Sequence, residues 1–85
     1  MMAAGVKVLL FGPLRDLAGW RERTVEPAPA PLSALKTLLG GLDSRLGAAL
    51  DGPGVTAAVD KAITPGDPSL RPGCEVAFLP PMSGG

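Results

Sequence analysis

Residues 32–42 carry the main helical pattern in this chain of 85 residues. Their large apolar side chains recur every three or four positions, which places them on one face of an α-helix: Leu32, Leu35, Leu38, Leu39 and Leu42. Pro31 fits the first turn, where its missing N–H costs nothing. We expect Gly40-Gly41 to end or loosen the helix. One amphipathic helix needs a second layer against which to bury its apolar face.

Four other stretches are predicted to be strands. Each is either rich in apolar or β-branched residues or mixes such residues with charged ones: 6–11, 22–26, 55–59 and 76–79. Residues 61–63 are expected to extend the third of these strands after a kink. The long loop over 64–73 contains one large apolar residue, Leu70, which we expect to fill the core.

Two short helices complete the predicted order. Leu14, Leu17 and Ala18 have helical spacing, and Gly19 is placed to end that helix. Asp43 or Ser44 can cap a second short helix. The order of elements predicts one α+β domain over residues 1–85, with a mixed sheet packed on one main helix and short extra helices.

Composition excludes several classes of function. Eight acidic and eight basic residues give a net charge of zero, without the basic stripe of a nucleic-acid-binding protein. No apolar run approaches the roughly 18 residues of a membrane span. With no secretory signal and one cysteine, the expected location is the cytoplasm. Cys74 is interpreted as an incidental thiol because no neighbour in sequence would activate it.

The chain contains no histidine. A Ser-His-Asp triad, a Cys-His pair and a histidine metal site are therefore impossible within it. If the protein takes part in chemistry, most of the acid–base groups must come from a partner.

The last six residues form a distinctive pattern. Pro80-Pro81 ends the final strand, since proline gives a sheet no N–H donor, and two adjacent prolines favour a stiff, extended segment. The residues that follow are Met82, Ser83, Gly84 and Gly85. A Gly-Gly finish can pass through a channel too narrow for any Cβ. Gly-Gly alone is a weak signal, but the whole pattern is specific, and we expect a flexible tail over 80–85.

The C-terminal pattern over 75–85 resembles the small, sulfur-carrying subunit of molybdopterin synthase, a member of the MoaD/ThiS-type ubiquitin-like family. Residues 6–19 are similar to that family's first strand and short helix. The resemblance covers nearly the whole chain. It implies a ubiquitin-like β-grasp fold.

The resemblance also implies a carrier that is not catalytic alone. An ATP-dependent adenylating (E1-like) enzyme, using ATP and Mg, would activate the carboxylate of Gly85, and a sulfur donor protein would convert it to a thiocarboxylate. The tail would then enter the large synthase subunit and give its sulfur to a cyclic pyranopterin phosphate in molybdenum cofactor biosynthesis. Gly84 would allow passage of the tail, and the chain itself would bind no cofactor or metal.

Strand alternation predicts where partners dock. Leu79 shares a face with Glu75, and Phe11 shares one with Lys7, so both apolar residues are expected to point outward. Outward apolar groups on a small domain often mark partner sites. The resemblance implies the same role for the following residues: Phe11, Ile63 and Leu79 for the large subunit, Arg15 for the activating enzyme, and Pro80, Pro81, Met82 and Ser83 along the tail.

Two other interpretations stay open. The first is a related ubiquitin-like carrier that delivers sulfur to thiamine or tRNA, or a protein modifier. The second is a non-catalytic interaction domain with an accidental Gly-Gly. The Phe-Leu-Pro-Pro approach to Gly-Gly favours the molybdopterin carrier over a thiamine carrier, and the match along the whole chain disfavours the interaction domain.

Overall fold

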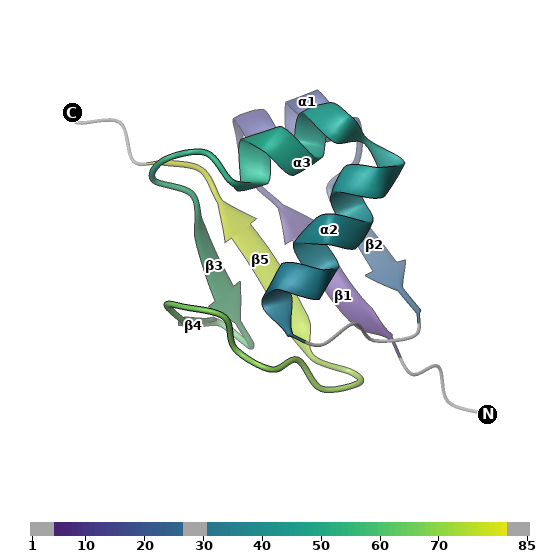
Figure 1. Cartoon of the computed structure of the whole chain (residues 1–85), viewed down its shortest axis with the longest axis vertical. Helices are drawn as coiled ribbons and strands as arrows, with labels where there is room; N and C mark the ends of the chain where they lie inside the picture. Colours follow the sequence, from purple (N-terminus) through teal and green to yellow (C-terminus); the bar gives the residue numbers. More distant parts are fainter. Residues whose placement is uncertain (1–4, 27–30, 82–85) are drawn as a thin grey trace.

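The computed structural model describes residues 5–26 and 31–81. Within them, one mixed sheet is covered on one face by helices, which confirms the predicted α+β class (Figure 1). The elements in chain order are β1 (Val6–Leu10), α1 (Pro13–Ala18), β2 (Glu22–Val25), α2 (Leu32–Leu42), α3 (Ser44–Leu50), β3 (Thr56–Val59), β4 (Ala62–Ile63) and β5 (Glu75–Leu79). No helix in these described ranges is both long and apolar enough to cross a bilayer.

The final strand occupies the middle of the sheet. The strand order is β2-β1-β5-β3-β4. β5 runs parallel to β1 and antiparallel to β3. The end of β5, the start of α1 and the start of β3 therefore meet at one end of the sheet (Figure 1).

The core lies between the sheet and the helices. Its fully buried side chains from β1 and β5 include Val8, Leu10, Val76 and Phe78. Leu70 is only 4% exposed and belongs to the same cluster, which confirms its predicted role as a core residue. Three of the five α2 leucines are buried, whereas Leu38 and Leu42 remain exposed on the flank of the helix. The buried face of α2 thus includes fewer leucines than the apolar pattern in the sequence.

Gly40-Gly41 does not itself end α2, because the helix continues for one more residue, to Leu42. Gly40 instead faces Gly47 of α3. A Cβ added to Gly47 would lie 2.5 Å from the Cα of Gly40. These two glycines let the helix backbones approach more closely than any side chain would permit.

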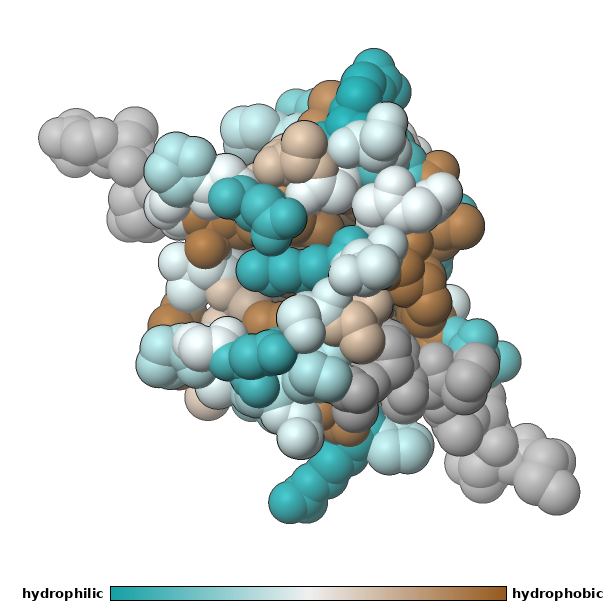
Figure 2. Space-filling model, viewed as in Figure 1, coloured by the Kyte–Doolittle hydropathy of each residue, from teal (hydrophilic) through white to brown (hydrophobic). Residues whose placement is uncertain are grey.

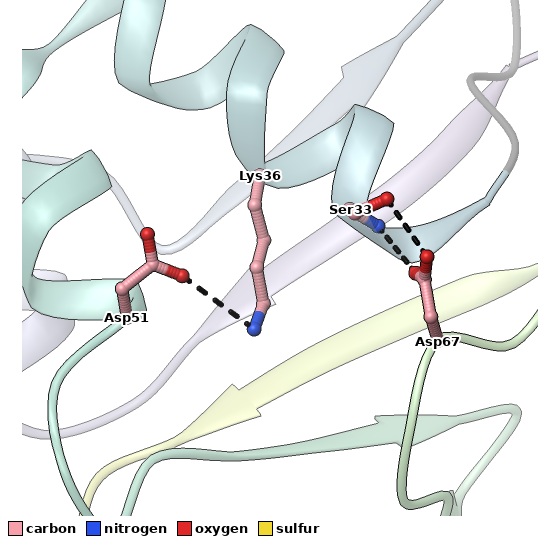
Figure 3. Close-up of polar contacts among 4 residues, drawn as sticks. All are labelled: Ser33, Lys36, Asp51 and Asp67. Carbon is pink, nitrogen blue, oxygen red and sulfur yellow. Dashed lines mark hydrogen bonds and ion pairs between the residues drawn. The ribbon is translucent and has the colours of Figure 1, made fainter.

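The start of α2 is held by a distant residue. Pro31 occupies the N-cap position, outside the first turn proposed for it, and makes no side-chain cap bond. The backbone N–H of Ser33 donates to Oδ1 of Asp67 at 2.7 Å, and its hydroxyl donates to Oδ2 at 2.8 Å (Figure 3). A carboxylate is favoured at this end of a helix by the exposed N–H groups and the helix dipole. At α3, the carboxylate of Asp43 accepts from the backbone N–H groups of Arg45 and Leu46, which confirms its predicted capping role.

The predicted extension of β3 over residues 61–63 is also wrong, because the chain turns back and β4 pairs antiparallel with β3. Asp60 and Lys61 have φ values of +49° and +71°, as the tight type I′ hairpin turn requires. Asp60 is held in place by Glu75, whose backbone N–H donates to Oδ1 of Asp60 at 2.9 Å. The other strand bounds differ from the predictions by about one residue, which is usual for element ends.

The close approach of α2 and α3 predicts opposite effects for two glycine substitutions. Gly47→Ala should lower the free energy of unfolding by about 1–3 kcal/mol, because its new methyl group would overlap the backbone at Gly40. Gly41→Ala, in the same helix pair, has no atom within 4 Å of the new Cβ and should raise that free energy by up to about 1 kcal/mol. Urea denaturation measures both. Equal effects of the two variants would contradict the proposed packing.

Candidate functional site

One row of small and apolar residues crosses the face of the sheet opposite α2 and α3. The strand register aligns Leu9 of β1 with Ala77 of β5, Ala77 with Ala58 of β3, and Ala58 with Ile63 of β4. Ala58 and Ala77 are buried but lie outside the core cluster. Leu79 follows on the same face of β5. We call this surface the open face, defined by Leu9, Ala58, Ile63, Ala77 and Leu79.

The predicted alternation along β5 is confirmed. Val76 and Phe78 are fully buried under the helices, whereas Leu79 is half-buried on the open face. Ile63, on the edge strand β4, is 60% exposed.

Phe11 is exposed as predicted, at 42%, but it is not part of a strand. β1 ends at Leu10, and the carbonyl of Phe11 accepts a hydrogen bond from the N–H of Leu14 at 3.2 Å. The chain is already turning into α1 at this point. Leu10, the last residue of β1, pairs with Phe78 of β5, and Phe11 and Leu79 each come one residue after this pair. Both therefore lie at the same end of the sheet.

Arg15 lies on α1, which begins two residues after Phe11. Its side chain is 51% exposed, and its Nε is 3.7 Å from Oδ1 of Asp16. An exposed pair of this kind holds a side chain only weakly. Arg15 is therefore available to a partner at the end of the sheet where β5 finishes.

Charge is concentrated toward the other end of the open face. Lys7 lies beside Glu75 in the register of β1 and β5, and its Nζ is 4.0 Å from Oε2 of Glu22 on β2. The open face thus changes from charged to apolar toward the end of the sheet where β5 leads into Pro80-Pro81. An apolar surface beside the exit is suited to docking, because burying it in a partner is favourable and costs little polar desolvation.

Two glycines at this end were not recognised from the sequence. An added Cβ on Gly12 would lie 3.2 Å from Cγ of Pro80, and one on Gly54 would lie 2.6 Å from Cβ of Pro81. In the sequence both glycines stand beside prolines and signal only a turn. The four predicted tail residues after Pro81 lie outside the described residues: Met82, Ser83, Gly84 and Gly85.

The side of the molecule formed by the helices is less suited to apolar docking than the open face. Figure 2 shows that hydrophilic side chains cross its centre, while apolar ones gather along one side. A groove of about 370 Å³ lies beside α2 and α3, and Lys36 and Asp51 line it with their Nζ and Oδ1 atoms 3.9 Å apart (Figure 3). Within the described part of the chain, no cluster of three or more potential metal ligands occurs. Cys74 is 6% exposed and belongs to the core.

Three known proteins are similar to this chain in fold or in sequence. The fold superimposes on the small archaeal modifier protein 1 of Methanosarcina acetivorans with a TM-score of 0.83 and 22% identity, covering 100% of both chains. A complex of subunits 1 and 2 of the molybdopterin-converting factor from Helicobacter pylori includes a chain that matches with a TM-score of 0.68 and 21% identity, covering 95% of this chain and 99% of that one. The molybdopterin synthase sulfur carrier subunit of Escherichia coli K12 is 34% identical over 80 residues, which is 94% of this chain and 99% of that protein.

The fold is therefore the ubiquitin-like β-grasp. The sequence profile of the ThiS family matches residues 8–85, and the chain belongs to that family. Within it, the protein is a homologue of the molybdopterin synthase sulfur carrier subunit. The resemblance inferred from the C-terminal pattern is confirmed.

Proposed function

We propose that this protein is the sulfur carrier subunit of a molybdopterin synthase. It would donate sulfur from a thiocarboxylate on Gly85 to a cyclic pyranopterin phosphate. One observation carries the proposal: β5 runs from the middle of the open face directly into Pro80-Pro81, so the docking surface and the Gly-Gly tail are consecutive parts of one segment. The 34% identity with the Escherichia coli carrier, which spans nearly both chains, supports it.

The chemistry must begin by activating the C-terminus. A terminal carboxylate is ionised at neutral pH and is a poor electrophile. In the proposed sequence, an E1-like enzyme with ATP and Mg adenylates Gly85, so that a carboxylate oxygen bonds to the α-phosphorus and pyrophosphate leaves. A sulfide equivalent from a donor protein then displaces AMP and leaves the thiocarboxylate.

The activated tail then enters the large subunit. Gly84 has no side chain to obstruct a narrow channel, and Pro80-Pro81 reduces the conformational entropy that insertion removes. Because this chain has no histidine, the acid–base groups for sulfur transfer come from the large subunit. Two rounds of transfer would build the dithiolene that later holds molybdenum.

The partners of the carrier would meet one end of the sheet. The Helicobacter pylori complex, in which subunits 1 and 2 of the converting factor associate, supports a second synthase subunit as a partner, and the open face is proposed as its docking surface. Arg15 is proposed to contact the activating enzyme. With its lone cysteine the chain can form no internal disulfide, which fits a reducing compartment such as the cytoplasm.

A second function is favoured by a specific similarity. The fold also matches the small archaeal modifier protein 1, so the same thiocarboxylate or adenylate could serve protein modification or tRNA thiolation. The two functions share activation and differ in the acceptor. Incubating the thiocarboxylated chain with a large synthase subunit and cyclic pyranopterin phosphate should produce molybdopterin. Conjugates on lysine with no molybdopterin would favour the modifier.

Gly85 is predicted to be the reactive end. Deleting Gly85, or adding one residue after it, should abolish thiocarboxylate formation, because the activating enzyme must reach a carboxylate placed at a fixed distance from the docking face. Thr37→Ala, at an exposed position of α2 that leaves the tail unchanged, serves as the control and should be modified normally. Mass spectrometry after reaction with ATP, activating enzyme and sulfur donor measures all three. Normal thiocarboxylation of the shortened chain would refute the assignment.

Phe11 is predicted to be an anchor for the large subunit. Phe11→Ala should weaken binding by roughly 30-fold, which corresponds to about 2 kcal/mol at a central apolar anchor, and should leave the melting temperature nearly unchanged. Leu38→Ala is the matched control, since Leu38 is 37% exposed against 42% for Phe11 but lies on α2. Titration calorimetry gives both affinities. Equal affinities for the two variants would show that docking does not use this end of the sheet.

A further inference from the structure

The base of the tail is held between two turns from distant parts of the sequence. Gly12, between β1 and α1, faces Pro80, and Gly54, between α3 and β3, faces Pro81. Gly12 has φ +56° and Gly54 has φ +81°, values that L side chains rarely adopt. At Gly54 a side chain is disfavoured both by the backbone and by space, because its Cβ would lie 2.6 Å from Cβ of Pro81. At Gly12 the backbone is the stronger obstacle, and a Cβ would press on the ring of Pro80 at 3.2 Å.

We propose that Gly12 and Gly54 are positioning residues, which together form a collar around Pro80-Pro81 and set the direction in which the tail leaves the sheet. The inference rests on the proposed function. The direction in which the tail leaves the sheet matters because Gly85 must reach the sites of its partners. The collar consists of these four residues.

A collar is needed because the sheet cannot hold the prolines itself. β5 pairs with β1 as far as Phe78 and with β3 as far as Leu79, and beyond Leu79 proline has no N–H with which to continue the ladder. Packing against Gly12 and Gly54 takes the place of these hydrogen bonds. The reacting carboxylate lies four residues beyond Pro81, up to roughly 13 Å away in extended chain. A rotation of about 15° at the collar would therefore displace it by about 3 Å, roughly the length of one hydrogen bond.

Both turns are anchored independently of the tail. The carbonyl of Gly12 accepts hydrogen bonds from the N–H groups of Arg15 at 3.1 Å and Asp16 at 3.3 Å, which begin α1. Gly54 comes just before β3, and Thr56 of β3 pairs with Leu79. The collar is thus fixed to the helix that carries Arg15 and to the strand that borders the open face.

The chain supplies a matched pair of variants. Gly66 has φ +80°, nearly the value of Gly54, but an added Cβ there meets no atom within 4 Å. Gly54→Ala and Gly66→Ala therefore introduce similar backbone strain, and only Gly54→Ala pushes against Pro81. Both variants should lower the melting temperature. At saturating large subunit, Gly54→Ala should slow single-turnover sulfur transfer by about tenfold or more, while Gly66→Ala should transfer at the wild-type rate.

A double-variant cycle shows whether the effect acts through Pro81. Pro81→Gly removes the ring and the Cβ that Gly54→Ala would meet. Adding Gly54→Ala to Pro81→Gly should then cause no further loss of transfer rate. A purely structural role for Gly54 predicts instead that the two effects multiply. If Gly54→Ala does not fold, Gly12→Ala tests the collar at Pro80. Gly19→Ala is its control, because Gly19 also has a positive φ but an added Cβ there meets no atom within 4 Å. Gly12→Ala should slow transfer relative to Gly19→Ala, and equal rates would contradict the collar.

A measurement without partners separates failure of the collar from failure of the proposed function. The amide chemical shift of Met82, next to Pro81, should change in Gly54→Ala and stay at its wild-type value in Gly66→Ala. If wild-type protein is never thiocarboxylated but the shift changes as expected, the proposed function fails and the collar stands. Equal transfer rates and equal Met82 shifts for the two glycine variants would overturn the collar.

Discussion

The structure depends on the pairing of β5 in the middle of the sheet. This strand hydrogen-bonds to β1 on one side and to β3 on the other, and its Val76 and Phe78 are fully buried under the helices. A central strand cannot move without breaking two ladders and opening the core. The segment that leads to the Gly-Gly tail is therefore the most strongly constrained part of the sheet. A rigid base of this kind would fix the starting point of the tail that carries the proposed thiocarboxylate.

Local signals in the sequence predicted the elements that local interactions determine. The α1 helix ends at Gly19 and α3 begins beside Asp43, because caps act within a few residues. The α2 helix, in contrast, depends on contacts with residues that are distant in the sequence. Its N-terminus is held by Asp67, 34 residues away from Ser33, and its passage through Gly40 depends on Gly47 of another helix. The Asp60-Lys61 turn was missed because neither residue is the glycine that usually indicates such a turn.

In the candidate site, too, some features follow from local sequence patterns and others depend on contacts between distant residues. Strand alternation, which is a local property, predicted the outward position of Leu79 and the exposure of Phe11, although β1 ends before Phe11. Gly12 and Gly54 could not be assigned from sequence, because a turn signal does not show which distant residue the turn faces. The partner roles of these residues, and of the tail beyond Pro81, remain predictions. They are linked to the structure by the convergence of β5, α1 and β3 at one end of the sheet.

The central claim is that the carboxylate of Gly85 is converted to a thiocarboxylate. The most direct test is the intact mass of the purified chain after incubation with ATP, Mg, candidate E1-like enzymes and a sulfur donor, followed by fragmentation to locate the change. The account predicts an increase equal to the replacement of one oxygen by one sulfur, confined to Gly85 and dependent on ATP. An unchanged mass with every activating enzyme able to modify the Escherichia coli carrier, or sulfur located on Cys74, would contradict it.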